Sequence, residues 1–193
     1  MEVKRLRATI ASAQGGQAQG FEALMEAYGP RLYGYFYRAT GNHHDAEDLL
    51  GEMMLRLVRT LRHYDDRGRF EPWLFRIAAN VVRDRIRRMK SNPAAASLSA
   101  QSESGQTLAD DVPGPHEAVE ADLLAAEASA DVREAMEKLD ETTRQMILLR
   151  HFGDMSFREI AEIFQCPLGT ALARVHRGLK ALRRVMGGKD GKA

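Results

Sequence analysis

Apolar residues recur near the start of the chain at intervals of three and four, the spacing that places them on one face of an α-helix. The first stripe consists of Phe21, Leu24, Met25 and Tyr28. The pair Gly29-Pro30 then predicts a break, because proline suits the first position of a helix and not its interior. The helix that Pro30 opens carries Leu32, Tyr33, Tyr35 and Phe36. The chain sustains no strand-like alternation, so the pattern predicts an all-α fold.

Two further helices follow with the same period. Gly41-Asn42 predicts a stop, and a helix from about His44 to Leu61 is expected to bury Ala46, Leu49, Leu50, Met53, Leu57 and Leu61. A polar turn, "HYDDRGRF", leads to a helix from Glu71 to about Lys90 with Pro72 in its first turn. The expected buried face of this helix consists of Leu74, Ile77, Ala78, Val81 and Met89, with Trp73 also predicted in the core.

The composition changes after residue 90. Residues 91–116 are rich in Ser, Ala, Gly and Pro and contain few large apolar residues, which predicts a flexible linker. Helical periodicity resumes near residue 117 and runs to about residue 186, and the tail 187–193 is expected to fray. The predicted architecture is therefore two small helical domains, 1–90 and 117–186, joined by the linker.

The second predicted domain ends in two short helices separated by a tight turn. Ser156 and Glu159 fit a capping box at the start of the first, and Pro167 prevents that helix from continuing. The second is expected to bury Ala171, Val175, Leu179 and Leu182. It presents a basic surface, as the recognition helix of a helix-turn-helix motif does in the major groove of DNA. The same pattern also fits a solvated helix in an ordinary bundle.

A basic stripe is predicted on the helix that ends the first domain. Its members are spaced four, three, four and three apart, which places them on one face: Arg76, Asn80, Arg83, Arg87 and Lys90. Such a face suits a nucleic-acid backbone, with the amide available for a base, although a solvent-exposed face is equally consistent with it. In the preceding loop, Tyr64 and Phe70 could stack on an unpaired base beside Arg67 and Arg69.

Carboxylates cluster at the start of the predicted 44–61 helix. Asp45, Glu47, Asp48 and Glu52 are stabilised there by the helix dipole, and they also suit docking of a basic protein partner. Metal binding by His43, His44 and Asp45 is disfavoured, because adjacent side chains on a helix point in different directions.

Composition and charge limit the chemistry and the cellular location that can be expected for the chain. The formal net charge is only +1, but basic and acidic residues are segregated along the chain. Cys166 is the single cysteine, which excludes an intramolecular disulfide and a two-cysteine metal site; Cys166 and His176 are expected to be structural or surface residues. No apolar run has the length of a signal-peptide core or a membrane helix, so a cytoplasmic location without membrane insertion is expected.

Three stretches together resemble a known family. They are "HHDAEDLLGEMMLRLVRTL", "RFEPWLFRIAANVVRDRIRR" and "LDETTRQMILLRHFGDMSFREIAEIFQCPLGTALARVHRGLKALRR". In this order they are similar to the two domains of a bacterial RNA polymerase sigma factor of the extracytoplasmic-function (ECF) group, in the sigma-70 family. The resemblance implies that region two binds the polymerase clamp helices and melts the minus-ten element. Region four would recognise the minus-thirty-five element as duplex and contact the polymerase flap.

The resemblance also implies roles for individual residues. The polymerase-binding positions would be Asp45, Glu47, Asp48, Leu49 and Glu52. The minus-ten positions would be Tyr64, Arg67, Arg69, Phe70, Arg76, Asn80, Arg83, Asp84 and Arg87. The minus-thirty-five positions would be Thr170, Leu172, Ala173, Arg174, His176, Arg177 and Lys180. Leu172 and Ala173 depart from the polar residues usual there; Leu172 could contact a thymine methyl or turn inward beside Leu168 and Val175.

The expected function is promoter-specific transcription initiation with core RNA polymerase, without catalytic activity, cofactor or metal. Partners implied by the resemblance are core polymerase, promoter DNA and an anti-sigma factor. One alternative is a stand-alone helix-turn-helix regulator, which would need a dimerisation surface or ligand pocket in the first domain. An enzyme using His43 and His44 lacks a nucleophile with an identifiable base. A further alternative is a protein that mimics a sigma factor in order to sequester the inhibitor of that sigma factor. Such a protein would not need the basic stripe, because it makes no DNA contacts.

Overall fold

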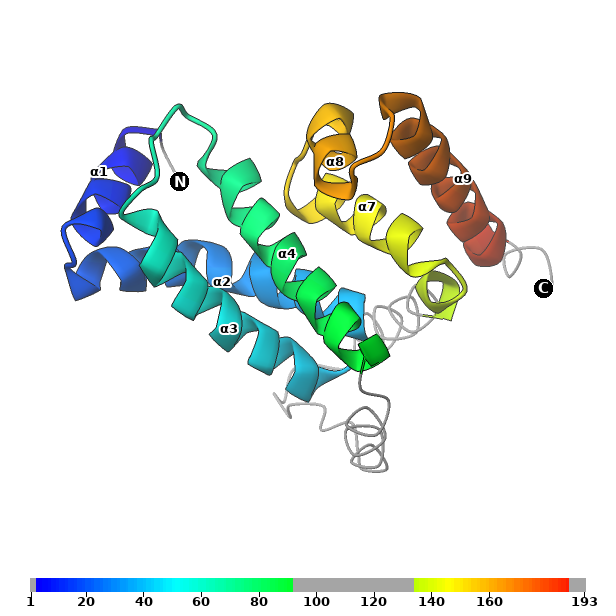
Figure 1. The fold of residues 1–193 in the computed structure, drawn as a ribbon, viewed down its shortest axis with the longest axis horizontal. Helices are drawn as coiled ribbons and strands as arrows, with labels where there is room; N and C mark the ends of the chain where they lie inside the picture. The colour runs from blue at the N-terminus through cyan, green and yellow to red at the C-terminus, as the bar shows by residue number, and fades with distance from the viewer. Residues whose placement is uncertain (1–2, 92–133, 188–193) are drawn as a thin grey trace, which may run out of the picture.

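The computed structural model describes residues 3–91 and 134–187. Within these ranges the chain is helical and contains no strand, which confirms the all-α prediction. Figure 1 shows the arrangement of the helices: α1 (Val3–Gln14), α2 (Ala18–Thr40), α3 (His43–Leu61), α4 (Phe70–Ser91), α7 (Glu141–Phe152), α8 (Phe157–Phe164) and α9 (Leu168–Gly187). The predicted linker 91–116 and the predicted restart near 117 fall almost entirely outside the described residues.

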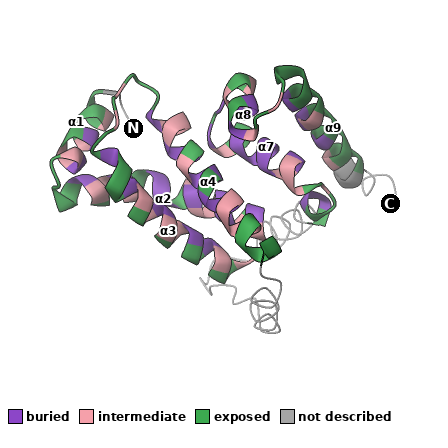
Figure 2. Ribbon diagram, in the orientation of Figure 1, coloured by how far each residue is buried: buried purple, intermediate pink, exposed green. Residues whose placement is uncertain are grey.

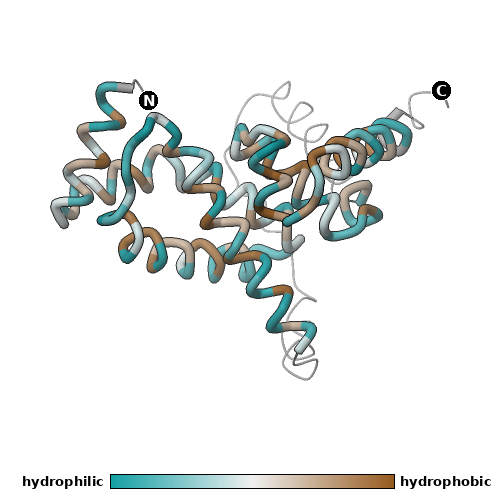
Figure 3. Tube along the Cα trace, turned by 45° about the horizontal axis from the view of Figure 1, so that its top comes forward, coloured by the Kyte–Doolittle hydropathy of each residue, from teal (hydrophilic) through white to brown (hydrophobic). Residues whose placement is uncertain are grey.

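The first domain is built from α1–α4 around an aromatic and aliphatic core. Buried residues repeat along each helix and face the centre, while polar residues face outward, so that hydrophobic and hydrophilic segments alternate along each helix (Figures 2 and 3). The largest fully buried side chains of α2–α4 are Leu24, Leu32, Tyr35, Phe36, Leu49, Met53, Leu57, Leu61, Phe70, Leu74 and Phe75. The predicted buried face of α3 is confirmed except at Leu50, which is half-buried.

The predicted break at Gly29-Pro30 is wrong, because α2 continues through Pro30 as one helix of 23 residues. An internal proline costs roughly 3 kcal/mol, since it lacks an N–H and crowds the preceding turn. Here Tyr28 and Leu32, on either side of the proline, are both buried in the same core. Packing of both halves of α2 on that core offsets the free-energy cost of the internal proline, so the helix continues without a break.

The boundary between α2 and α3 follows the sequence signal. Gly41 adopts the left-handed conformation (φ 76°) that favours glycine, and its N–H donates to the Tyr37 carbonyl at 2.7 Å. The Asn42 side chain then accepts a hydrogen bond from the Asp45 N–H at 3.0 Å, capping α3. The predicted stop at Gly41-Asn42 is therefore confirmed.

Helix α1 was not anticipated, although its pattern is present. Ile10 and Ala13 are buried against α2, and Leu6 packs beside them at the matching interval of four. Gly20 lies so close to Ala13 that a side chain at Gly20 would meet the Ala13 backbone. This close approach ties α1 to the first turn of α2.

The second domain packs α7, α8 and α9 around Met146, Leu149, Ile160 and Val175. The predicted capping box of α8 is confirmed, with Ser156 and Glu159 bonded reciprocally. Two predicted core positions are wrong: Leu179 is 39% exposed on α9, and Met89 is exposed near the end of α4. Gly178 occupies the place where α9 crosses α7.

The two domains pack against one another. Helices α2 and α4 contact α7, and α4 also contacts α8. In Figure 1, α4 lies between α3 and the second domain, so the helix that carries the basic stripe is next to α7 and α8. The outer side of α9 faces away from the first domain.

Candidate nucleic-acid interface

The acidic start of α3 divides into paired and open carboxylates. Asp45 forms an ion pair with Arg85 of α4. Glu52 lies between Arg56 at 2.6 Å and Arg88 at 2.8 Å. Burial acts to raise the pKa of Glu52, but hydrogen bonds from these two arginines outweigh it and lower that pKa below its usual range. Asp45 and Glu52 therefore join α3 to α4.

The remaining members of the acidic set lie in different environments. Leu49 is buried in the core and cannot contact a partner directly. Glu47 and Asp48 are exposed, and Asp48 lies 3.8 Å from the exposed His44 ring. These two carboxylates are therefore the members of the predicted set that are exposed on the surface of α3.

The loop before α4 places its rings in a packed cluster. Phe70 is 2% exposed, so the expectation that its ring could stack on a base does not fit the structure. Tyr64 packs on Trp73 with centroids 4.4 Å apart, and both are half-buried against the core. Burial and the neighbouring Asp66 raise the pKa of Tyr64 to about 12, so its hydroxyl stays protonated. Arg67, paired with Asp65 at 2.8 Å, is exposed at the tip.

The basic stripe lies along one face of α4 as predicted, and part of it contacts the second domain. Arg76 pairs with Glu162 of α8 at 3.1 Å. Arg83 donates to the Ile163 carbonyl at 2.6 Å, and its guanidinium lies 5.6 Å from the centre of the Phe164 ring.

The other residues of α4 predicted for the minus-ten surface differ in exposure and in pairing. Asn80 and Arg87 are exposed. Asp84 pairs with Arg56 at 2.9 Å and with Arg87 at 3.8 Å, which makes it part of the α3–α4 ion network.

Helix α9 presents the predicted recognition surface to solvent. Thr170, Ala173, His176, Arg177 and Lys180 are exposed. Leu172 is 42% exposed and therefore does not turn inward, which decides between the two orientations open to it.

Arg174 differs from its neighbours on α9. Its guanidinium donates to Asp140 at 2.9 Å and to the Thr143 hydroxyl at 3.4 Å, so it is held against the start of α7. Burial opposes ionisation of Asp140, yet hydrogen bonds from Thr143 and the charge of Arg174 lower its pKa.

Comparison with known proteins extends this picture. Residues 24–91 match the family model of sigma-70 region 2, and residues 129–182 match that of sigma-70 region 4. The chain is 31% identical over 179 residues to the ECF RNA polymerase sigma factor SigW of Bacillus subtilis, covering 93% of this chain and 95% of SigW. The chain belongs to the ECF group of sigma-70 family sigma factors.

This sigma factor directs promoter-specific transcription initiation by RNA polymerase and is non-catalytic. It is also 26% identical to the RNA polymerase sigma-H factor of Pseudomonas aeruginosa, over 92% of this chain and 91% of that one. Two solved structures share its fold. One is CnrH in complex with the cytosolic domain of CnrY (TM-score 0.61, 22% identity, 94% and 97% coverage). The other is RpoE of Bartonella quintana in complex with the anti-sigma factor NepR (TM-score 0.62, 20% identity, 88% and 98% coverage).

The sequence prediction missed one surface of this sigma factor. Leu55 is 61% and Val58 45% exposed on α3, beyond the exposed Glu47 and Asp48. The available signal was their register, because the buried stripe of α3 runs through Met53 and leaves both residues outside it. Exposed large apolar residues beside carboxylates suit a protein partner better than DNA.

Neither metal binding nor membrane insertion finds support in the described parts of this sigma factor. Across residues 3–91 and 134–187, no group of three or more His, Cys, Asp or Glu side chains could hold a metal ion. No helix in those ranges is long and apolar enough to cross a membrane.

Proposed function

We propose that α3 carries the polymerase-binding face of this sigma factor. Glu47 and Asp48 supply exposed carboxylates for a basic partner, and Leu55 and Val58 supply apolar area that is exposed in the free chain. Asp45, Leu49 and Glu52 act indirectly, by fixing α3 on the core and on α4. This assignment refines the set of residues that the family resemblance implies.

We also propose that the basic stripe and the loop before it hold the melted minus-ten strand. The stripe supplies Arg76, Arg83 and Arg87 for phosphates and Asn80 for a base edge. Arg67 and Arg69 in the loop extend the positive surface, and Tyr64 with Trp73 provides a partly exposed aromatic platform. Asp84 acts by positioning Arg56 and Arg87.

The minus-thirty-five element is assigned to the exposed face of α9. Arg177 and Lys180 suit guanine edges and phosphates, and His176 and Thr170 lie on the exposed surface of the same helix. Leu172 and Ala173 are exposed apolar groups in the first turns of the recognition helix. Apolar side chains at such positions contact thymine methyl groups. Arg174 orients α9 through Asp140 rather than contacting a base.

One observation carries this proposal: basic side chains line two separate helices, α4 in the first domain and α9 in the second. Its test is transcription by core polymerase on a fragmented genomic template, with transcript starts sequenced. The wild-type protein is expected to give discrete starts that share two spaced upstream elements. A Leu55→Asp/Val58→Asp variant is expected to lose core binding, and a Lys4→Ala/Arg5→Ala variant on α1 serves as the exposed-surface control. Core binding that survives the aspartates would refute the assignment of α3.

The role of Leu172 has a sharper test. Replacing one thymidine of the minus-thirty-five element by deoxyuridine removes a single methyl group. The holoenzyme is expected to lose about two- to fivefold in affinity at the contacted position, since a buried methylene-sized group contributes about 0.8 kcal/mol. The loss should disappear in Leu172→Ala. Equal losses in both proteins would show that Leu172 does not make this contact.

We propose an anti-sigma factor as a further partner. The fold relative RpoE was solved with the anti-sigma factor NepR, and CnrH with the cytosolic domain of CnrY. Because the chain acts on RNA polymerase, we infer that it works in the cytoplasm. Affinity capture from cells with the full chain, with and without the Leu55→Asp/Val58→Asp change, would locate such a partner. A partner that is lost together with polymerase occupies the polymerase face, and one that is retained binds elsewhere on the chain.

A further inference from the structure

The loop between α3 and α4, residues 62–69, is held by the last residue of α1. The side-chain amide of Gln14 donates to the Leu61 carbonyl at 3.0 Å and to the Tyr64 carbonyl at 2.7 Å. The end of a helix leaves carbonyls without donors in the helix itself. This amide therefore supplies hydrogen bonds to the last residue of α3 and to the first part of the loop, which lie 47 and 50 residues further along the chain.

A second residue of α1 reaches the tip of the same loop. Arg7 lies seven residues before Gln14, which is two helical turns and therefore the same face of α1. Its guanidinium pairs with Asp66 at 3.4 Å. The other oxygen of Asp66 accepts from the Gly68 N–H at 2.9 Å and from the Tyr64 hydroxyl at 3.3 Å. Asp66 thus joins α1 to the turn in which Gly68 adopts the left-handed conformation (φ 73°).

These contacts meet at Tyr64, whose ring the proposed function assigns to the melted strand. Its carbonyl is bonded to Gln14 and its hydroxyl to Asp66, so the residue is fixed at its backbone and at the far end of its side chain. The Tyr64 ring lies 4.4 Å from the ring of Trp73 and meets the Phe70 ring edge-on at 5.5 Å. The position of the aromatic platform therefore depends on α1.

Helix α1 is a firm support for the loop because it packs tightly on α2. Ile10 and Ala13 are 1% and 2% exposed. A Cβ at Gly20 would lie 2.4 Å from the backbone nitrogen of Ala13, so the two backbones are in direct contact there. The loop passes beside α1 at the end of the molecule opposite α9 (Figure 1).

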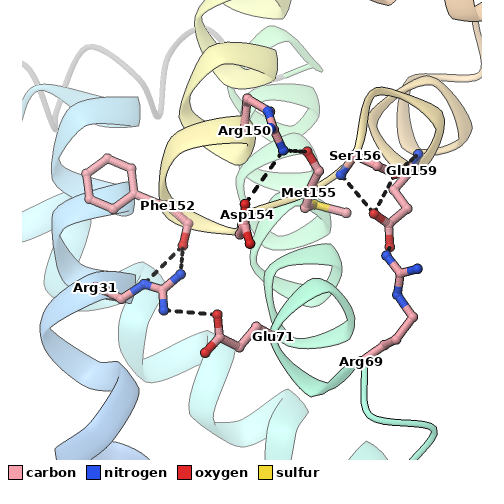
Figure 4. Close-up of polar contacts among 9 residues, drawn as sticks. All are labelled: Arg31, Arg69, Glu71, Arg150, Phe152, Asp154, Met155, Ser156 and Glu159. Carbon is pink, nitrogen blue, oxygen red and sulfur yellow. Dashed lines mark hydrogen bonds and ion pairs between the residues drawn. The ribbon is translucent and has the colours of Figure 1, made fainter. Parts of the chain in front are cut away.

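The loop has a further contact of a different kind. Arg69, at its end, donates to Glu159 in the capping box of α8 (Figure 4). This ion pair joins the two domains, and the Arg69 side chain is 61% exposed. The contacts from α1 lie within the first domain and do not depend on where the second domain is. They can hold the loop in place while region four is bound to the minus-thirty-five element.

We propose that Gln14 and Arg7 are positioning residues for minus-ten recognition, which hold the loop in the conformation that presents Tyr64 and the neighbouring cations to the displaced strand. This inference rests on the proposed DNA-binding role of the loop. A loop that is already ordered loses little conformational entropy on binding, so a preformed platform binds more tightly than a mobile one. Because α1 precedes residue 24, this support lies outside the segment that matches sigma-70 region 2.

Fluorescence tests the effect of α1 on the loop in the full chain. Gln14→Met keeps the length and helix propensity of glutamine but removes the N–H donors, so α1 should still form. Gln19→Met, at an exposed position of α2, is the matched control. Trp73 is the single tryptophan, so its emission reports on the platform. We expect Gln14→Met to raise acrylamide quenching of Trp73 about twofold and Gln19→Met to leave it unchanged. Unchanged quenching in Gln14→Met would overturn the proposal.

Promoter opening by the holoenzyme tests the functional consequence, on a promoter identified from the sequenced transcript starts. Gln14→Met should reduce permanganate reactivity of the minus-ten region about five- to tenfold, as expected for the loss of two hydrogen bonds that order the loop. Core binding and duplex minus-thirty-five binding should remain as in wild type. Opening equal to that of Gln19→Met would overturn the proposal.

A charge variant gives a second version of the test that leaves Gln14 in place. Arg7→Gln removes the ion pair to Asp66 and should reduce opening about two- to threefold, because the pair is partly exposed. Arg5→Gln makes the same change in net charge at an exposed position of α1. Equal losses from both variants would show that charge, and not the contact with the loop, is responsible, and would overturn the role of Arg7.

A double-mutant cycle shows whether α1 acts through the loop and separates this inference from the proposed function. Tyr64→Leu/Arg67→Ala/Arg69→Ala removes the groups of the loop that are assigned to DNA. Adding Gln14→Met to this loop variant should cost less than twofold in opening, and equal losses in both backgrounds would overturn the proposal. If the loop variant itself opens promoters as well as wild type, the proposed function of the loop is wrong. If it is defective while Gln14→Met is not, only the positioning role of α1 is wrong.

Discussion

Helices α4 and α9 are both basic and amphipathic, but their cations are in different situations. On α4, Arg76 and Arg83 bind α8. On α9, Arg177 donates to the Ala173 carbonyl of its own helix, and both Arg177 and Lys180 are exposed. The contrast shows that charge and periodicity identify a binding face, whereas its availability depends on how the domains are placed.

The difference has an energetic consequence. Solvent-exposed ion pairs contribute about 0–1 kcal/mol each, so α8 holds the stripe weakly. Binding of DNA phosphates is strengthened by the release of counterions, an effect that α8 does not have. Promoter DNA can therefore replace α8 once the domains are free to separate, whereas α9 needs no such exchange.

The largest expected effect comes from removing the stripe. Arg76→Ala/Asn80→Ala/Arg83→Ala should reduce promoter opening by the holoenzyme on the order of 100-fold or more, since each base or phosphate contact contributes about 1–3 kcal/mol. Permanganate footprinting of the minus-ten region measures the opening. Binding to a duplex minus-thirty-five probe should not change. A parallel loss of duplex binding would mean that the two helices do not act separately.

Gly178→Val should disable α9 through stability rather than charge. A Cβ at Gly178 would lie 2.7 Å from side-chain methyl groups of both Ile147 and Thr143 of α7, so either these side chains or α9 must shift. We expect a loss of about 1–3 kcal/mol in the free energy of unfolding of the second domain, measured by urea denaturation. Gly169→Val is the matched change at an open position of the same helix. Equal destabilisation by both would contradict the close α7–α9 packing.

Removing cations from α9 should have a moderate effect. Arg177→Ala/Lys180→Ala is expected to weaken duplex minus-thirty-five binding by about tenfold and to lower the salt dependence of binding by about two phosphate contacts. Single-strand binding should remain as in wild type. An Arg158→Ala variant on α8 controls for general loss of charge.

The smallest expected effect is one of pH. Burial opposes ionisation of Glu159, but hydrogen bonds from Ser156 and the neighbouring Arg69 lower its pKa, and of these only the contact with Arg69 depends on the packing of the two domains. When one form of a protein lowers the pKa of a carboxylate, that carboxylate stabilises this form at pH values above its unperturbed pKa. The stabilisation is lost as the pH falls through the lowered pKa. The population in which α8 packs on α4 should therefore fall two- to threefold as pH drops below about 4, followed by X-ray scattering. Glu159→Gln should remove this dependence, and a pH response unchanged by that substitution would exclude Glu159 as its source.

Sequence periodicity predicted the local structure of this sigma factor well. The cap at Gly41-Asn42, the buried positions of α3 and the capping box at Ser156 depend on neighbours within one or two turns. The stripe on α4 follows from spacing alone. Such features are visible in sequence because the residues that form them lie close together along the chain.

Features that depend on distant contacts were not predictable in this way. The continuity of α2 through Pro30 depends on packing of both halves in the core. The burial of Phe70, and the pairing of Arg76 with Glu162, join residues or surfaces far apart in the chain. The exposed Leu55 was visible in principle, but apolar residues outside a buried stripe become informative only when the structure shows that nothing covers them.

The most direct test of the account is a distance measurement between the two domains. Spin labels would be attached to the native Cys166, beside α8, and to a cysteine introduced by Glu26→Cys on α2. Pulsed electron paramagnetic resonance would then measure the distance between the two labels. We predict one narrow distance distribution in the free protein and a longer one when core polymerase and promoter DNA are bound. The same distribution in both states, or a broad one in the free protein, would contradict the claim that α8 covers the stripe until the domains separate.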